Sequence, residues 1–193
     1  MNRMFITAAA VAVAIAGPAL AASLGVGASA PDFNLTAYKK GNPFQFNLKN
    51  ELKKGPVVLY FFPGAYTAGC NIEAQAFAAR IADFRAAGAQ VVGVTGGFGK
   101  TAKADQTKDY ASLNEAVADF SKTHCNGEFP VVAADAKIIA DYGVPLTQRP
   151  GWSDRTSFVI GKDDKIVLAH TDPAPNSHIT DSLKAVQDLK AAR

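Results

Sequence analysis

The sequence predicts an α/β protein in which helices cover both faces of a mixed β-sheet. An uninterrupted β-branched and aromatic run at 57–62 is typical of a central strand that is buried on both faces. Further short apolar runs alternate with segments of helical period as far as residue 142. A hairpin pattern and an amphipathic segment then close the chain. This alternation favours a mixed sheet between two helical layers.

The first predicted helix follows the run at 57–62. Residues 70–87 place Phe77, Ile81 and Phe84 at helical spacing, and Gly88 follows as a helix terminator. Because Val91 to Val94 is a short apolar run after that glycine, we expect it to form the next strand.

The second half of the chain continues the alternation. Ser112 to Glu115 fits a capping box, and the helical period continues through Phe120. The remaining predicted elements are a strand at 129–133, a short helix at 138–142, a hairpin of 158–160 with 166–169 about a turn at 161–164, and a final helix at 179–189. The segment 96–110 is rich in Gly, Lys and Asp and is expected to be an exposed loop.

Composition excludes several classes of protein. The 193 residues are 48% hydrophobic and 19% charged, which suits a packed core rather than wholesale disorder. A net charge of +3 is too weak to indicate nucleic-acid binding. Two cysteines and three histidines leave little for a zinc site, and no C-x-x-C motif is present. We expect neither a metal nor an organic cofactor.

The N-terminal 21 residues read as a secretory signal peptide. Arg3 precedes an apolar run that is too short to span a bilayer comfortably, and Ala19 to Ala21 form an A-x-A cleavage site. The alternative is a transmembrane anchor, which Gly17 and Pro18 disfavour because they interrupt the run. We therefore expect a signal peptide at 1–21, a single domain at 22–193, periplasmic export and no membrane association after cleavage.

Reactive chemistry is expected where the strand at 57–62 ends. Pro63 stops that strand, Thr67 can cap the following helix, and Cys70 falls in the first helical turn. The start of a helix presents unpaired N–H groups and a partial positive charge, so a thiol placed there ionises more easily than a free cysteine. A buried, inert cysteine is the alternative, but a strand-to-helix junction at a sheet edge favours function.

Pro63, Thr67 and Cys70 match the P-x-x-x-T-x-x-C signature of the peroxiredoxins, and other segments resemble the same family in order along residues 25–190. These segments are Ala30 to Leu35 (A-P-D-F-x-L), Phe129 to Val131 with Asp135, Tyr142 to Val144, and Arg155 to Ile160 (R-x-[ST]-F-[VL]-I). The resemblance is nearest to the Q-type, or bacterioferritin-comigratory, subfamily. It implies a thioredoxin-like fold and thiol-dependent reduction of hydrogen peroxide and organic hydroperoxides.

The resemblance also implies roles for individual residues. Cys70 would be the peroxidatic cysteine, whose thiolate attacks the peroxide and becomes a sulfenic acid. Thr67 would hydrogen-bond the thiolate and the peroxide, and Arg155 would hold the thiolate charged and polarise the leaving oxygen. Pro63 would shield the sulfur. We interpret Glu73 as support for the first helical turn or as a salt-bridge partner.

The second cysteine decides how such a cycle closes. Many Q-type members carry a resolving cysteine where this chain has Gln75, so Cys125 is the candidate here. We expect Cys125 to attack the sulfenic acid of Cys70 and form an intramolecular disulfide, which a thioredoxin-like dithiol protein then reduces. A permanent Cys70–Cys125 disulfide and a one-cysteine cycle with an inert Cys125 remain as alternatives.

Two rival functions remain open from sequence alone. One is a redox-active regulatory or disulfide-handling protein with a thioredoxin fold. The other is a non-catalytic secreted module with a structural Cys70–Cys125 bond. For the peroxidase, we expect a monomer or weak homodimer. Trp152 is expected in the loop before Arg155, where it lines the pocket or packs in the core or on the surface.

Overall fold

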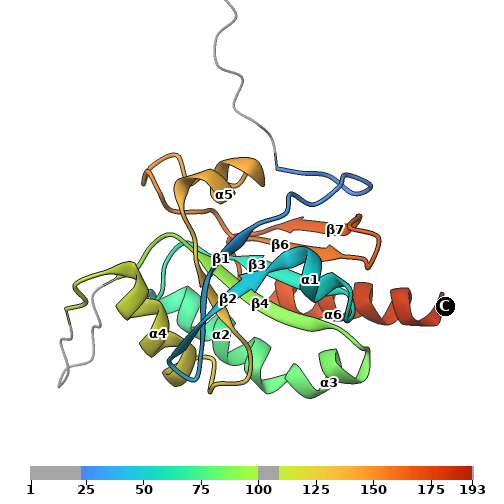
Figure 1. Ribbon diagram of the computed structural model, residues 1–193, viewed down its shortest axis with the longest axis horizontal. Coiled ribbons are helices and arrows are strands. Elements are labelled where there is room, and N and C mark those ends of the chain that lie inside the picture. Colours follow the sequence, from blue (N-terminus) through green and yellow to red (C-terminus); the bar gives the residue numbers. More distant parts are fainter. Residues whose placement is uncertain (1–22, 100–108, 193) are drawn as a thin grey trace, which may run out of the picture.

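A seven-stranded mixed sheet forms the centre of the molecule (Figure 1). The computed structural model describes residues 23–99 and 109–192. The predicted signal peptide at 1–21 and the greater part of the predicted loop at 96–110 lie outside these residues. The strands are β1 (Asn34–Lys39), β2 (Asn42–Asn47), β3 (Val57–Phe61), β4 (Gln90–Thr95), β5 (Val131–Ala133), β6 (Thr156–Ile160) and β7 (Ile166–Thr171). Their order is β2-β1-β5-β4-β3-β6-β7, with parallel pairing only within β3, β4 and β5.

Helices cover both faces of the sheet, as the sequence predicts. They are α1 (Leu48–Leu52), α2 (Ala68–Ala79), α3 (Ile81–Ala86), α4 (Leu113–Thr123), α5 (Ala136–Asp141) and α6 (Asn176–Ala191). Two buried apolar clusters show how they are layered. Residues of α2, α3, α4 and α6 pack on one face, and residues of α1 and α5 pack on the other. Figure 1 shows α5 across the sheet from α2, α3 and α4.

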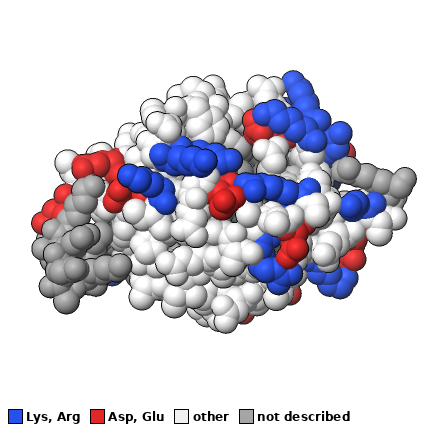
Figure 2. Space-filling view, turned by 90° about the horizontal axis from the view of Figure 1, so that it is seen from below, with Lys and Arg blue, Asp and Glu red and all other residues white. Residues whose placement is uncertain are grey.

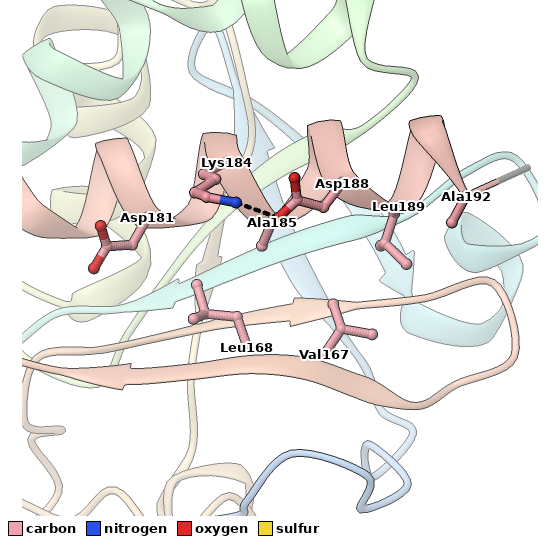
Figure 3. A pocket seen from close by; sticks show the side chains of 8 residues that line it. All are labelled: Val167, Leu168, Asp181, Lys184, Ala185, Asp188, Leu189 and Ala192. Atoms are coloured by element: carbon pink, nitrogen blue, oxygen red, sulfur yellow. Dashed lines mark hydrogen bonds and ion pairs between the residues drawn. The ribbon is translucent and has the colours of Figure 1, made fainter.

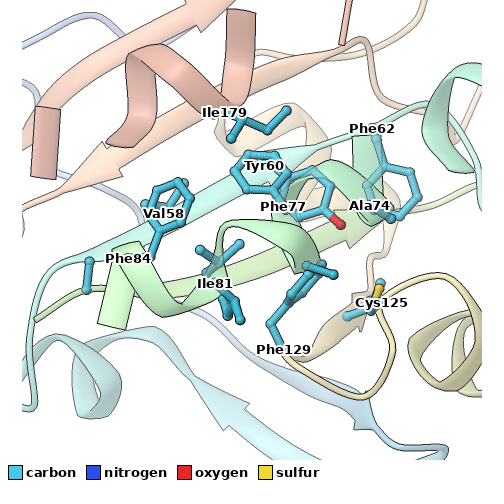
Figure 4. Packing of buried hydrophobic residues seen from close by; sticks show 14 of the residues in the cluster. Val58, Tyr60, Phe62, Ala74, Phe77, Ile81, Phe84, Cys125, Phe129 and Ile179 are labelled. Carbon is cyan, nitrogen blue, oxygen red and sulfur yellow. The ribbon is translucent and has the colours of Figure 1, made fainter. Parts of the chain in front are cut away.

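Strand β3 contributes to both clusters, which explains its continuous apolar sequence. Val58 and Tyr60 face the cluster beneath α2 (Figure 4), whereas Leu59 and Phe61 face the opposite cluster. All five side chains of β3 are buried. Because successive side chains of a strand point to opposite faces, a strand covered on both sides needs an apolar residue at every position.

Two local predictions differ from the structure. The predicted helix at 70–87 is two helices, since Arg80 leaves the helical region with φ −106° and ψ 7°. The kink still directs Phe77 and Phe84 into one core. At α4, only half of the predicted capping box forms. The Ser112 hydroxyl accepts from the Glu115 amide at 3.2 Å, but the Glu115 carboxylate accepts from the Ala111 amide instead of the Ser112 amide.

The β1–β2 hairpin has no counterpart among the predicted elements. The two strands meet at Lys40 and Gly41, which have φ values of 54° and 80°. Consecutive left-handed residues form a tight hairpin turn whose twist matches that of the strands. Most side chains of β2 are exposed, so the strand lacks the apolar alternation that signals a buried face.

The described surface carries charges of both signs. Basic and acidic side chains are interspersed over the face seen in Figure 2. Among residues 23–99 and 109–192, no helix has the length and apolar character that crossing a membrane requires.

Candidate functional site

Cys70 lies at the start of α2, one loop beyond the end of β3. Thr67 occupies the N-cap position in an extended conformation, and its carbonyl accepts the first helical hydrogen bond from Asn71 at 2.9 Å. Cys70 therefore falls in the first turn, where the helix presents unpaired amides. The side chain is buried, with 1% exposure. The predicted position of Cys70 at a strand-to-helix junction is confirmed.

Arg155 reaches Cys70 because of how β6 pairs with β3. The two strands run antiparallel, with Thr156 beside Phe61. Arg155, the residue before β6, therefore lies at the end of β3, where the loop to α2 begins. The Arg155 guanidinium donates through Nη2 to Cys70 Sγ at 3.6 Å. Its side chain is only 9% exposed. A buried cation that cannot lose its proton thus directly faces the sulfur.

Glu73 holds the same guanidinium from its other side. Its Oε2 pairs with Arg155 Nη1, while Arg155 Nε donates to the Pro173 carbonyl at 3.1 Å. Three acceptors therefore fix the plane of one guanidinium. Glu73 is fully buried, and burial raises its pKa to about 8 while Arg155 opposes that rise. The geometry confirms the interpretation of Glu73 as the partner of Arg155, and the contact is a salt bridge once the carboxyl ionises.

The guanidinium also passes close to the backbone of α2 at Gly69. A Cβ atom at that position would lie 3.1 Å from Arg155 Nη2, which is tighter than ordinary contact. Glycine therefore leaves the space through which the guanidinium reaches Cys70. Gly69 is not among the predicted site residues, because no local pattern indicates which distant side chain crosses a helix start.

Thr67 occupies the N-cap position of α2, but its side chain does not cap the helix. A side-chain cap needs the hydroxyl oxygen to accept from an amide of the first turn, and no such bond forms. The prediction of a side-chain cap is therefore wrong. The hydroxyl instead donates to the Gly64 carbonyl at 3.0 Å. The bond braces the loop that leads into α2.

Pro63 is held at the end of β3 by neighbouring loops. Its carbonyl accepts a hydrogen bond from the Thr95 hydroxyl at 3.3 Å. The same carbonyl oxygen packs against Gly97, where an added Cβ atom would lie only 2.5 Å from it. The indole of Trp152 packs on the backbone of both Gly64 and Gly97. Among the possibilities raised for Trp152, the structure places it against the loop that precedes α2.

Cys125 is the second cysteine, just beyond α4. It is fully buried within the apolar cluster of Figure 4. Cys70 belongs to the same cluster, and both thiols are free. Burial raises the pKa of Cys125 far above its ordinary value, with a smaller opposing effect of the Tyr60 hydroxyl. The structure therefore does not contain the permanent disulfide that sequence alone left open.

The segment before Cys125 contacts α2. Gln75 Nε2 lies 3.3 Å from His124 Nδ1. Gln75 occupies the position at which the family resemblance implies a resolving cysteine in many relatives. Its side chain thus contacts His124, the residue directly before Cys125.

Two grooves of the described surface are lined by none of the predicted site residues. A groove of 480 Å³ between β7 and α6 is lined by Val167, Leu168, Asp181, Lys184, Ala185, Asp188, Leu189 and Ala192 (Figure 3). None of these is a predicted site residue. Within the described ranges, no group of three His, Cys, Asp or Glu side chains could hold a metal ion.

Comparison with known proteins agrees with this arrangement. The AhpC/TSA family model matches residues 26–169. Peroxiredoxin Q of Sedum lineare is 29% identical over 165 residues, with 85% of this chain and 78% of that protein aligned. Peroxiredoxin Q of Arabidopsis thaliana is 32% identical over 172 residues, with 89% and 69% aligned.

Solved structures with the same fold include two mycobacterial proteins. Peroxidoxin BcpB of Mycobacterium tuberculosis superposes with a TM-score of 0.69 at 24% identity, over 88% of this chain and 99% of that one. AhpC of Mycobacterium tuberculosis superposes with a TM-score of 0.66 at 20% identity, over 87% and 99%. These superpositions establish the thioredoxin-like fold that the resemblance implied.

Proposed function

This chain belongs to the AhpC/TSA family of peroxiredoxins and is a thiol-dependent peroxidase, and from that premise we propose that Cys70 is its peroxidatic cysteine. The contact between Arg155 Nη2 and Cys70 Sγ at 3.6 Å carries this proposal. A helix start and a fixed cation both lie at the sulfur. They also offer donors for the negative charge that develops on the peroxide oxygen.

The first chemical step is a nucleophilic displacement at oxygen. The Cys70 thiolate attacks the terminal oxygen of a hydroperoxide, the S–O bond forms and the O–O bond breaks. The sulfur is oxidised to sulfenic acid, and the leaving alkoxide or hydroxide takes up a proton to become an alcohol or water. In this step the Arg155 guanidinium faces both the sulfur and the negatively charged oxygen of the leaving alkoxide or hydroxide. Pro63 shields the sulfur, and Thr67 braces the loop that carries it.

We assign Cys125 as the resolving cysteine. Its thiol attacks the Cys70 sulfenic acid, the disulfide forms, and water leaves with the sulfenic oxygen. Burial raises the pKa of the Cys125 thiol, which favours its protonated form in the folded protein. A disulfide requires Cα atoms within about 7 Å, and we expect the first turn of α2 to unwind as the bond forms. A thioredoxin-like dithiol protein then reduces the disulfide.

Location and assembly are further parts of the proposal. The sequence at 1–21 supports export to the periplasm and removal of a signal peptide. A monomer or weak homodimer is the proposed state of the mature protein. N-terminal sequencing of the exported protein tests the cleavage after Ala21, and light scattering of reduced and oxidised protein tests the assembly.

Rapid mixing of the reduced protein with hydrogen peroxide, followed by intact-mass measurement, tests the assigned chemistry. Wild type should lose both thiols and gain one intramolecular disulfide. Cys70→Ser should not react rapidly. Cys125→Ser should react once, gain one oxygen atom and then stop. If Cys125→Ser turns over normally with the same protein reductant, Cys125 is not the resolving residue.

A further inference from the structure

His178 is a buried histidine that takes no direct part in the chemistry assigned to Cys70. It lies in the first turn of α6 and has no exposed surface. Both of its ring nitrogens have partners: Nε2 lies 2.8 Å from the carbonyl oxygen of Asp172, and Nδ1 lies 2.9 Å from Ser157 Oγ. Because buried polar groups with all their partners in place rigidify the segments that they join, the two partners indicate what His178 holds together.

The two partners also determine which nitrogen of His178 carries the proton. A carbonyl oxygen only accepts hydrogen bonds, so Nε2 is protonated and donates to Asp172. Burial lowers the pKa of His178 to about 4, which keeps the ring neutral near neutral pH. Nδ1 of a neutral ring that is protonated at Nε2 is an acceptor, so the Ser157 hydroxyl donates to it. The imidazole therefore has one orientation, with its donor toward the segment after β7 and its acceptor toward β6.

These two hydrogen bonds reach the two segments that place Arg155. Ser157 lies on β6, two positions after Arg155. Asp172 directly precedes Pro173, whose carbonyl accepts from Arg155 Nε at 3.1 Å. The Asp172 amide also donates to the Arg155 carbonyl at 3.3 Å. His178 therefore connects the strand that follows Arg155 to the turn that holds its guanidinium.

The turn between β7 and α6 is also braced from within. Asp172 Oδ1 accepts from the Ala174 amide at 2.7 Å, and Asp172 Oδ2 accepts from the Ser177 hydroxyl at 3.1 Å. These bonds set the shape of the turn, whereas His178 sets its position relative to β6. Because the Pro173 carbonyl belongs to this turn, the position of the turn decides where Arg155 Nε finds its acceptor.

We propose that His178 is a positioning residue for the peroxide reaction, which holds the Pro173 carbonyl where that oxygen directs the Arg155 guanidinium at Cys70. The inference rests on the proposed function of Cys70. Arg155 Nη2 lies 3.6 Å from the sulfur, in the same rigid plane as Nε. A displaced acceptor at Nε would therefore turn Nη2 away from the sulfur. His178 thus acts through Arg155 and not on the sulfur itself.

Two substitutions of His178 test this role through the second-order rate with hydrogen peroxide. His178→Leu removes both hydrogen bonds and should slow the reaction by at least about tenfold, since a misplacement of about 1 Å can cost about a hundredfold. His178→Gln keeps an N–H donor for the Asp172 carbonyl and should recover most of the lost rate. Ser182→Ala is the matched control and should react at the wild-type rate. Its hydroxyl is buried one turn further along α6 and finds no hydrogen-bond partner among the described residues.

A double-mutant cycle with Arg155→Lys separates positioning from a general structural role. Lysine has no guanidinium plane to direct, so His178→Leu should cause no further loss of rate in that background. A merely structural role would lower the rate by the same factor in both backgrounds, because independent effects add. Ser157→Ala weakens the same connection from β6 and should behave in the same way, which keeps the test available if His178→Leu folds poorly. Circular dichroism of each variant controls for folding.

Each outcome has a distinct meaning. If folded His178→Leu reacts at the wild-type rate while Cys70→Ser does not react rapidly, the positioning role is overturned and the assignment of Cys70 stands. If His178→Leu or Ser157→Ala costs the same factor with Arg155 and with lysine in its place, the effect does not pass through the guanidinium and the inference is again overturned. If Cys70→Ser reacts as rapidly as wild type, the assignment of Cys70 fails, and the inference fails with it.

Discussion

Arg155 and Cys70 are separated by 85 positions in the chain, yet the guanidinium lies 3.6 Å from the sulfur. The antiparallel pairing of β6 with β3 produces this approach, since it sets Thr156 beside Phe61. Glu73 and the Pro173 carbonyl then orient the guanidinium. The proposed reactive centre is therefore built by the register of two central strands together with the first turn of one helix.

Arg155→Lys should lower the rate of the peroxide reaction by about a hundredfold, the usual cost of losing one fixed donor at a developing anion. Lysine keeps the charge but cannot contact Cys70, Glu73 and the Pro173 carbonyl together, because it lacks the planar fork. The second-order rate with hydrogen peroxide measures the effect. Arg149→Lys, at the cation that stacks on Trp152, is the matched control and should react at nearly the wild-type rate. Equal rates for Arg155→Lys and wild type would show that the guanidinium contact is not needed.

Glu73 should make the stability of the fold depend on pH. Its pKa is raised from 4.5 to about 8, so the folded carboxyl keeps a proton that the unfolded chain releases above pH 4.5. This contribution is therefore fully present below pH 4.5 and is lost as the pH rises through about 8. Between those values the free energy of unfolding should fall by up to about 1.4 kcal/mol per pH unit.

Urea unfolding of wild type and Glu73→Gln at several pH values measures the contribution of Glu73. Glutamine resembles the protonated carboxyl and does not titrate, so the variant should have a flatter profile across this window. Glu128→Gln, at the exposed Arg85 ion pair, is a suitable control and should keep the wild-type slope. An identical slope in Glu73→Gln would contradict the prediction.

Gly69→Ala should change stability and reactivity in opposite directions. Alanine favours the helix by up to about 1 kcal/mol over glycine, so the variant should unfold at the same or a higher urea concentration. Its new methyl group would press on Arg155 Nη2 from 3.1 Å, which shifts the guanidinium away from Cys70. We expect a several-fold slower peroxide reaction. A variant with unchanged reactivity would mean that the guanidinium has room to move.

Trp152 should report on the cycle through its fluorescence. It is the only tryptophan in the sequence, and it packs on Gly64 and Gly97 beside the loop before α2. If that loop moves when the disulfide forms, the emission should change at the same rate as disulfide formation measured by mass. Cys125→Ser should lack this phase. Emission that stays constant in the oxidised wild type would argue against movement of the loop.

The sequence predicts the segment around Cys70 well because its signals are local. Apolar continuity identifies β3, Pro63 ends it, and the residues that follow begin a helix. The hairpin of β6 and β7 is predicted for the same reason, from two apolar runs about a turn. Each of these predictions depends on residues that are close together in the sequence, and conformational propensity and hydrophobic periodicity are properties of such short segments.

Features that depend on distant contacts could not be predicted in this way. Arg155 entered only through the resemblance to a family, since no spacing rule places it beside Cys70. Gly69 gives no signal, because its importance lies in its contact with the distant Arg155. Thr67 is predicted to cap α2, but its hydroxyl donates to the Gly64 carbonyl and accepts from no amide of the first turn. Which hydrogen bond a threonine hydroxyl makes is decided by three-dimensional geometry.

The pairing of β3 with β6 has a consequence for how this enzyme can evolve. Side chains along a strand alternate between faces, so a slip of one residue would turn Arg155 toward the opposite layer while leaving an apolar strand in place. A one-residue deletion within β6 should therefore misplace Arg155 and leave an inactive protein. The turn at 161–164 lies at the other end of β6 and leads to the outer strand β7. Length changes in that turn should therefore act away from Arg155.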